Sequence, residues 1–193
     1  MLIGAIALFL GAYLLGGVNM ALAVSRARGV DIRQVGSGNP GASNVLRAVG
    51  KGPAVLVYLV DLAKGFVPAL VGLLVWSPYV GAAAGLAAVL GHCYPVYHRF
   101  RGGKGVATAG GAVLAVAPPV MVAMVIVYGV ALVLSRISAV GSLAAAVVSI
   151  PALLLTGQTR GTVAWFALMM VLIVFRHRSN LSRLRSGTEN RLA

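Results

Sequence analysis

The chain has 193 residues, of which 60% are hydrophobic and only 10% charged, whereas an ordinary soluble domain has roughly 45–50% apolar and ~25% charged residues. It contains 16 lysines and arginines but only three acidic residues, which gives a formal net charge of +13. So few charged side chains cannot cover a water-facing exterior, which excludes a soluble globular protein, and three carboxylates exclude carboxylate-rich metal cages and paired-acid glycosidases.

Apolar stretches long enough to cross a bilayer, which takes about 20 residues, recur along the chain. They lie at residues 2–24, 53–76, 79–96, 137–155 and 162–175, the last somewhat short. The first has no charged leader and no small-residue cleavage site, so we interpret it as a retained span and not a signal peptide. Asp61 and Lys64 interrupt the second span at i, i+3 spacing, which favours an ion pair on one helix face over a catalytic role. The single cysteine, Cys93, has no zinc-ligand spacing around it, and we predict no metal site.

The segment at residues 106–135 is too long for one comfortable helix, and Pro118 and Pro119 interrupt it. If the prolines form a turn, the chain has seven spans, and 14 of the 16 Lys and Arg share one side, with Arg160 opposite and Lys64 inside a span. A single crossing gives six spans and a split of nine against six, close to random. Because cytoplasmic loops carry an excess of Lys and Arg, we predict seven spans, with the fourth and fifth short. The fold class is then all-α: one transmembrane domain over residues 1–193, with the N-terminus outside and the C-terminus cytoplasmic.

The loop after the first span joins a glycine-rich turn to a helix. Three glycines and a proline in residues 36–41 exclude a helix there, and the following residues predict a helix with Ser43 or Asn44 as its N-cap. Helix N-termini favour anions, and Arg47, about one turn inside, adds a fork of donors. We therefore predict a phosphate cradle formed by Gly36, Ser37, Gly38, Asn39, Gly41, Asn44 and Arg47. The alternative is a loop that is merely flexible.

A second glycine-rich turn precedes the span that begins at Val106. It consists of Gly102, Gly103, Lys104 and Gly105, and Thr108 falls in the first turn of the following helix. Glycines allow close backbone approach and the lysine adds a point charge, so this segment also predicts a phosphate site. The Walker spacing is absent and no carboxylate lies nearby to organise magnesium, which argues against nucleotide hydrolysis. His92, at the cytoplasmic end of the third span, is either a buried hydrogen-bonding strut or a ligand contact.

The C-terminal stretch is basic, and most of its arginines are interpreted as headgroup-facing anchors. His177 and Asn180 are three residues apart, so on a helix they share a face and can point toward the two glycine-rich loops. The seven-span topology brings both loops and this pair to one membrane face. Two phosphate cradles indicate two phosphate-bearing ligands, most economically an amphiphile from the lipid and a soluble phosphate from the cytoplasm.

Three motifs, in this order and spread over nearly the whole chain, resemble those of the bacterial acyl-phosphate:glycerol-3-phosphate acyltransferase family. The family patterns are GSGNxGATN followed by Arg, GHxxPxFxxFKGGKGVAT and RHxxNIxRL, and they correspond to residues 36–47, 91–108 and 176–184, with Ser43, Tyr97 and Arg101 as substitutions. Many relatives carry Glu before the last motif's Asn, where this chain has Ser179, so any ion pair made by that Glu must be missing or replaced.

The resemblance implies transfer of a fatty acyl group from acyl-phosphate to the 1-hydroxyl of glycerol 3-phosphate, giving lysophosphatidic acid and phosphate, with no cofactor. It also implies the bacterial cytoplasmic (inner) membrane, with the active site on the cytoplasmic side. The expected partners are the two substrates, membrane lipid and the soluble enzyme that makes acyl-phosphate, but no nucleic acid.

We expect His177, Asn180 and Ser37 to take part in catalysis. No Asp or Glu lies in any motif, which leaves His177, His92 or a donor phosphate oxygen to accept the hydroxyl proton. Our hypothesis is that the donor phosphate is the base and that His177 and Asn180 orient the substrate.

Two other functions compete with this interpretation. A transporter of organic phosphates suits short apolar spans with basic loops, but it predicts binding groups near mid-membrane and a path to the outer face. The polar motifs here cluster on one side, and Arg160 is the one outer charge. A CDP-alcohol phosphotransferase needs several aspartates on one helix, which this chain lacks.

Overall fold

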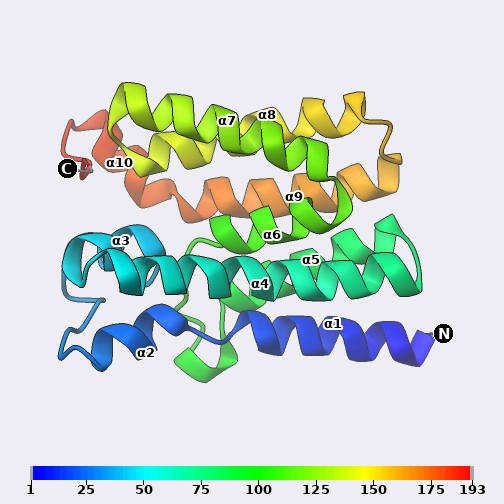
Figure 1. The fold of residues 1–193 in the computed structure, drawn as a ribbon, viewed down its shortest axis with the longest axis horizontal. Helices are drawn as coiled ribbons and strands as arrows, with labels where there is room; N and C mark the ends of the chain where they lie inside the picture. The colour runs from blue at the N-terminus through cyan, green and yellow to red at the C-terminus, as the bar shows by residue number, and fades with distance from the viewer. Residues whose placement is uncertain (1, 192–193) are drawn as a thin grey trace.

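The computed structural model describes residues 2–191, and within that range every regular element is helical, which confirms the all-α class. The elements are α1 (Leu2–Gly16), α2 (Met20–Arg26), α3 (Ala42–Ala48), α4 (Lys51–Val75), α5 (Pro78–Cys93), the 3-10 helix η1 (Val96–His98), α6 (Val106–Val116), α7 (Pro118–Ser135), α8 (Ser138–Leu155), α9 (Arg160–Arg176) and α10 (Arg178–Arg185). The long helices lie side by side along one axis (Figure 1).

Five segments of the described chain are long and apolar enough to cross a membrane. They are Leu2–Arg26, α4, Pro78–His98, α7 and α8. Helices α9 and α10 meet at a 50° bend, and they make a sixth candidate if the pair is one span. The remaining apolar helix, α6, has only 11 residues. The structure therefore supports a multi-pass membrane protein with five or six candidate spans, and a count of seven requires that α6 also crosses.

The proline pair is a turn, as the sequence predicts. Pro118 and Pro119 begin α7, at positions where a missing backbone N–H costs no helical hydrogen bond. Figure 1 shows α7 running back from the end of α6 and lying beside α8. The prediction that both neighbouring spans are short is wrong for the second of them. Because the prolines start the helix, all 18 residues to Ser135 are helical, and α7 is a full-length candidate span.

The two ends of the bundle differ in charge. The N-terminus, the α4–α5 turn and the α8–α9 connection lie at one end, and the α2–α3 loop, the α7–α8 connection and α10 lie at the other (Figure 1). By sequence, the second group carries Arg28, Arg33, Arg136, Arg178, Arg183 and Arg185, whereas the described residues of the first group carry no basic side chain and the α8–α9 connection leads only to Arg160. We call the end with the second group the basic end. The α5–α6 connection lies inside the length of the bundle, nearer the basic end.

The predicted ion pair within the second span is confirmed. Lys64 Nζ lies 2.7 Å from Asp61 Oδ1, and both side chains are buried. The same ammonium donates to the carbonyl of Val18, 2.9 Å away, at the break between α1 and α2. This pair therefore joins α4 to the first span as well as neutralising two charges inside the bundle.

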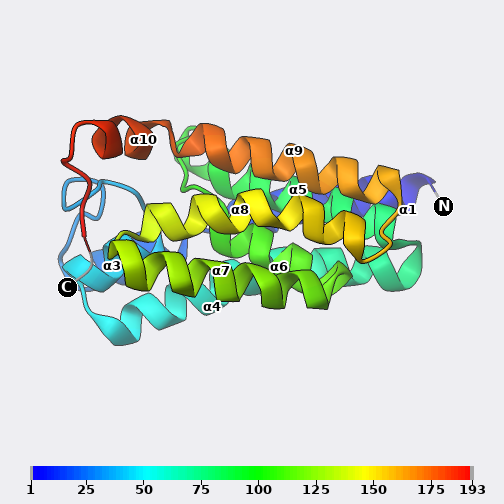
Figure 2. The ribbon, with the colours of Figure 1, turned by 90° about the horizontal axis from the view of Figure 1, so that it is seen from above.

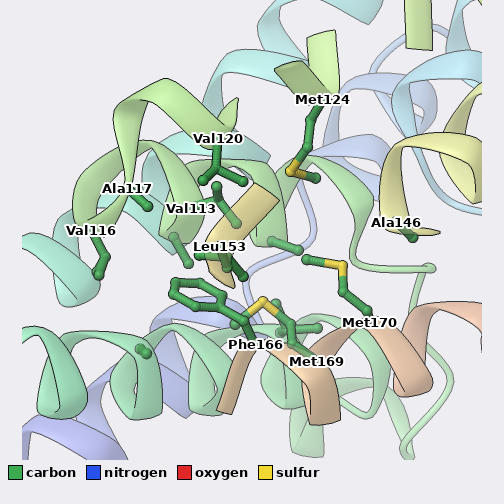
Figure 3. Packing of buried hydrophobic residues seen from close by; sticks show 14 of the residues in the cluster. Val113, Val116, Ala117, Val120, Met124, Ala146, Leu153, Phe166, Met169 and Met170 are labelled. Carbon is green, nitrogen blue, oxygen red and sulfur yellow. The ribbon is translucent and has the colours of Figure 1, made fainter. Parts of the chain in front are cut away.

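Small residues let α4 and α6 pack with their backbones in contact. A Cβ atom on Gly65 would lie 1.8 Å from the carbonyl oxygen of Thr108, and one on Gly111 would lie 2.0 Å from that of Leu62. The main apolar cluster is built around α6 and includes Val113, Met124 from α7, Leu153 from α8, and Phe166, Met169 and Met170 from α9 (Figure 3). This packing fixes the start of α6, and with it the glycine-rich turn that precedes it.

Candidate active site

A cavity of about 420 Å³ lies where the three motif-bearing segments meet. Its wall combines polar side chains from the α2–α3 loop, α3, the α5–α6 connection and the C-terminal segment with apolar side chains from α6, α7 and α8. The polar and ionisable lining residues are Ser37, Asn39, Ser43, Asn44, Arg47, Tyr58, Asp61, His92, Lys104, Tyr128, Ser138, Ser142, His177, Asn180 and Glu189.

Most of the residues predicted from the sequence line this one cavity. Those in its wall are Ser37, Asn39, Gly41, Asn44, Arg47, His92, Lys104, Gly105, His177 and Asn180. The others are absent from the wall and lie behind it: Gly36, Gly38, Gly102, Gly103 and Thr108. Segments more than 100 residues apart in the chain thus meet in space, as the predicted topology requires.

The first glycine-rich loop is held by the side chain of Asn44, which the sequence predicts as a helix cap. The N-cap of α3 is Gly41, so the predicted cap at Ser43 or Asn44 is wrong. The buried Asn44 instead accepts a hydrogen bond from Ser37 N at 3.0 Å and donates to the carbonyls of Ile32 and Val35 at 3.1 and 3.0 Å. Because α3 has only seven residues, the groups that this loop offers to an anion are side chains such as Arg47 more than a helix terminus.

The second glycine-rich turn presents fewer free donors than its sequence suggests. The N–H groups of Gly102 and Gly103 already donate to the carbonyls of Cys93 and His92, at 3.2 and 3.1 Å. The prediction that these two amides bind phosphate is therefore wrong in this structure, because tertiary contacts with the end of α5 occupy them. Gly105, with φ +81°, starts α6 and still lines the cavity.

Arg176 fixes this turn from the opposite side. Its guanidinium donates to the carbonyls of Gly102 and Gly103, at 2.9 and 3.1 Å, and lies over the ring of Tyr94, 5.1 Å from the centroid. The motif comparison covers Arg176, but its role as a clamp depends on contacts about 73 residues away in sequence, which no local pattern reveals.

Lys104 is the cation that this clamped turn directs into the cavity. Its Nζ donates to Oδ1 of Asn180. Burial, opposed by the carboxylate of Glu189 and assisted by the neighbouring arginines, lowers the pKa of the Lys104 ammonium to about 8. The ammonium is therefore charged at neutral pH, but its charge is sensitive to small changes around it.

His177 and Asn180 come together at the bend between α9 and α10, and both are buried. His177 Nδ1 lies 2.8 Å from the carbonyl of Ile173. Since a carbonyl only accepts, Nδ1 carries a proton, and in the neutral imidazole Nε2 is then left as an acceptor. Asn180 Nδ2 donates to Glu189 Oε2 at 2.9 Å. The prediction that this pair points toward the glycine-rich loops is confirmed, since both residues line the cavity with Ser37, Asn39 and Lys104, but His177 lies at the bend and not within a helix.

The environment of His92 favours the strut over the ligand contact. Nδ1 lies 3.3 Å from Thr108 Oγ1 and 3.6 Å from Asp61 Oδ1. Nε2 faces Gly103, where a Cβ atom would lie only 2.2 Å away. Protein atoms thus surround both ring nitrogens, and His92 with Thr108 supports the turn from behind.

The cavity wall also contains two carboxylates, Asp61 and Glu189, that the sequence does not predict to lie there. Asp61 was expected to be only an ion-pair partner of Lys64. Glu189 was assigned no role, although the substitution at Ser179 raised the question of a replaced ion pair. In the structure Arg183 pairs with Glu189 at 3.0 Å.

Comparison with known proteins adds independent information. The family model described as "Glycerol-3-phosphate acyltransferase" matches residues 6–187. A protein of that name from Rubrobacter xylanophilus is 46% identical over 180 residues, covering 93% of this chain and 90% of its own. One from Thioalkalivibrio sulfidiphilus is 49% identical over 189 residues, covering 96% and 93%.

Solved structures agree with these relatives. The glycerol 3-phosphate form of PlsY (YgiH), an integral membrane glycerol 3-phosphate acyltransferase, is similar to this chain with a TM-score of 0.96 at 40% identity, covering 98% of this chain and 96% of that one. Its lysophosphatidic acid form is similar with a TM-score of 0.93 at 39% identity and the same coverage.

Proposed function

The chain belongs to the glycerol-3-phosphate acyltransferase family, and from that premise we propose that it uses acyl-phosphate as the acyl donor. In the proposed reaction the 1-hydroxyl oxygen of glycerol 3-phosphate attacks the acyl carbon and forms the ester bond of lysophosphatidic acid. The bond between the acyl carbon and the phosphate oxygen breaks, and the hydroxyl proton leaves with inorganic phosphate. The atoms balance without a metal or a cofactor.

The observation that carries this proposal is the two-sided character of the cavity. Lys104 and Arg47 supply charge at its polar end, while Met121, Met124 and Val125 of α7 line its apolar side. An amphiphile with a phosphate head and a fatty chain matches this distribution. Two clustered cations suit a reaction in which the protein mainly positions and neutralises phosphates, because phosphate is already a good leaving group.

The cavity also reaches the lipid-facing side of the bundle. Tyr58 of α4 and Val125 of α7 both line it, and they are 42% and 52% exposed. An acyl chain entering sideways between α4 and α7 would pass these two residues and bring its phosphate toward Lys104. Soluble glycerol 3-phosphate would reach the same point from the basic end.

The donor itself serves as the base in the proposed mechanism. The cavity's carboxylates already have partners, since Asp61 pairs with Lys64 and Glu189 with Arg183. His177 Nε2 is the competing acceptor, and its fixed ring suits an orienting role. A His177→Gln variant that bound both substrates but lost all turnover, together with a pH profile that traced an imidazole, would make His177 the base.

In the proposed topology α6 is a short seventh crossing, and the basic end of the bundle faces the bacterial cytoplasm. The positive-inside bias supports this orientation. An impermeant maleimide applied to intact cells is expected to label Thr156→Cys, in the α8–α9 connection, and not Ser186→Cys after α10. Labelling of the second variant alone would reverse the orientation.

Release of inorganic phosphate from purified protein tests the choice of donor. We expect release with acyl-phosphate plus glycerol 3-phosphate, unchanged by a metal chelator, and no transfer when acyl-CoA replaces acyl-phosphate. Equal transfer from acyl-CoA would refute the donor proposal while leaving membership of the family intact.

The pKa of Lys104 predicts how glycerol 3-phosphate binding depends on pH. A bound phosphate dianion favours the charged ammonium, so binding is strongest below about pH 8 and weakens as the pH rises through that value. Titration calorimetry between pH 6.5 and 9.5 should show the loss of affinity. Lys104→Arg should remove the alkaline loss because arginine stays protonated throughout this range. An affinity that is flat in the unmodified protein would contradict the assignment of phosphate to Lys104.

A further inference from the structure

The C-terminal segment after α10 turns back over the cavity. Figure 2 shows it running from α10 toward α3, where the Arg47 guanidinium lies 3.5 Å from the carbonyl of Asn190. The side chain of Glu189 is only 4% exposed and lines the cavity. The family model ends at residue 187, so this carboxylate lies beyond the part of the chain that the family match covers. The proposed reaction gives it no task.

One carboxylate oxygen of Glu189 accepts hydrogen bonds from two side chains of the site. Its Oε2 accepts hydrogen bonds from Asn180 Nδ2 at 2.9 Å and from Arg183 Nε at 3.0 Å, and Oε1 accepts from the backbone N–H of Asn190 at 3.2 Å. Hydrogen bonds to a charged acceptor are roughly twice as strong as neutral ones. The carboxylate is therefore firmly held against Asn180.

We propose that Glu189 is a positioning residue, which fixes the side-chain amide of Asn180 so that its oxygen faces the ammonium group of Lys104. The inference rests on the proposed binding of substrate phosphate at Lys104. An asparagine amide has two orientations related by a half-turn, with an acceptor on one side and donors on the other. With a carboxylate beside one end and an ammonium beside the other, only one orientation satisfies both.

Glu189 also balances the charge around Lys104. Three arginines face Lys104 from the surrounding elements: Arg47 from α3, Arg176 from α9 and Arg183 from α10. The carboxylate that opposes them is Glu189, from the C-terminal segment. Its removal would leave a buried amide donor without its partner and would lower the pKa of Lys104 further.

Glu189→Gln and Glu189→Ala test this role in the full-length protein. We expect kcat/KM for glycerol 3-phosphate to fall about tenfold, the low end for losing a charge-assisted hydrogen bond. The alkaline limb of its pH profile should move to lower pH by about one unit, the low end of the effect of an adjacent opposite charge. Glu189→Asp, which keeps the charge on a shorter side chain, should restore most of the alkaline limb.

Two variants serve as matched controls. Asp31→Asn removes one negative charge from an exposed carboxylate that bonds only within its own turn, and Thr188→Ala alters the exposed residue next to Glu189. Both should retain the kcat/KM and the pH profile of the unmodified protein. Thermal unfolding in detergent and calorimetric binding of glycerol 3-phosphate are measured for every variant.

Three results would overturn the proposal. A Glu189→Gln variant that matched the unmodified protein in both kcat/KM and pH profile would show that Asn180 needs no anchor. Tighter binding of glycerol 3-phosphate would make Glu189 a plug that competes with phosphate. A lower unfolding temperature with an unmoved alkaline limb would make it a purely structural brace. If Lys104→Gln also binds glycerol 3-phosphate normally, it is the proposed phosphate site that fails.

Discussion

Replacing Lys104 with glutamine is expected to lower kcat/KM for glycerol 3-phosphate by about 10²–10³-fold, the typical cost of removing a preorganised donor from a site of developing charge. Lys104 is the cation that the clamped turn directs into the cavity, where it contacts Asn180. Glutamine is nearly as long, and its amide N–H can still donate to Asn180 Oδ1, so the fold should survive while the charge is lost.

Steady-state kinetics on purified protein measure this effect, and calorimetry separates lost binding from slower turnover. Lys51→Gln is the matched control, because Lys51 starts α4, is exposed and does not line the cavity. It removes the same charge from the same end of the bundle and should retain nearly full activity. A fall of less than about threefold for Lys104→Gln would be far below the range for such a donor and would remove Lys104 from the proposed phosphate site.

Gly102→Ala is expected to lower kcat/KM by about 10²-fold, because a displacement of about 1 Å in positioning groups costs that much. A Cβ atom at this position would lie 2.0 Å from the carbonyl oxygen of His92 and 2.6 Å from Pro95 Cδ. Neither neighbour can move freely, since the first is helical backbone and the second a ring. The turn must shift instead, and Lys104 shifts with it.

Gly129→Ala provides the control for this substitution. Gly129 lies in α7, and a Cβ atom there would meet nothing within 4 Å. It adds the same methyl group without a clash and should leave kinetics unchanged. If Gly102→Ala were as active as Gly129→Ala, the turn would be able to accommodate a methyl group without moving Lys104. Close packing against α5 would then not be what positions Lys104.

Local chemistry allowed the fold class and much of the cavity wall to be predicted. Hydropathy, the proline pair and the i, i+3 spacing of Asp61 and Lys64 act over one or two helical turns, and the structure agrees with each of them. The exception was the length of α7, because the prolines begin that helix and do not shorten it.

The errors within the site arise from contacts that reach beyond one or two helical turns of the chain. The N-cap of α3 was misplaced because Asn44 bonds to the preceding loop at Ile32 and Val35. The sequence does not show that the amides of Gly102 and Gly103 are occupied, because an intervening loop separates them from the end of α5, whose carbonyls accept from them. Glu189 carries no motif signal, since its position against Asn180 depends on a tail that folds back over the bundle.

The polar end and the apolar side of the cavity differ in how well they tolerate substitution. The polar end is held in place by Arg176, Asn44 and backbone contacts of glycine, whereas α7, which contributes to the apolar side, buries only Val120 and Met124. Under the proposed function, mutations on α7 would therefore reshape the space for the hydrocarbon tail with little loss of packing elsewhere. Such mutations would then change which acyl chains are accepted, and hence the fluidity of the bilayer, without any change at the polar end.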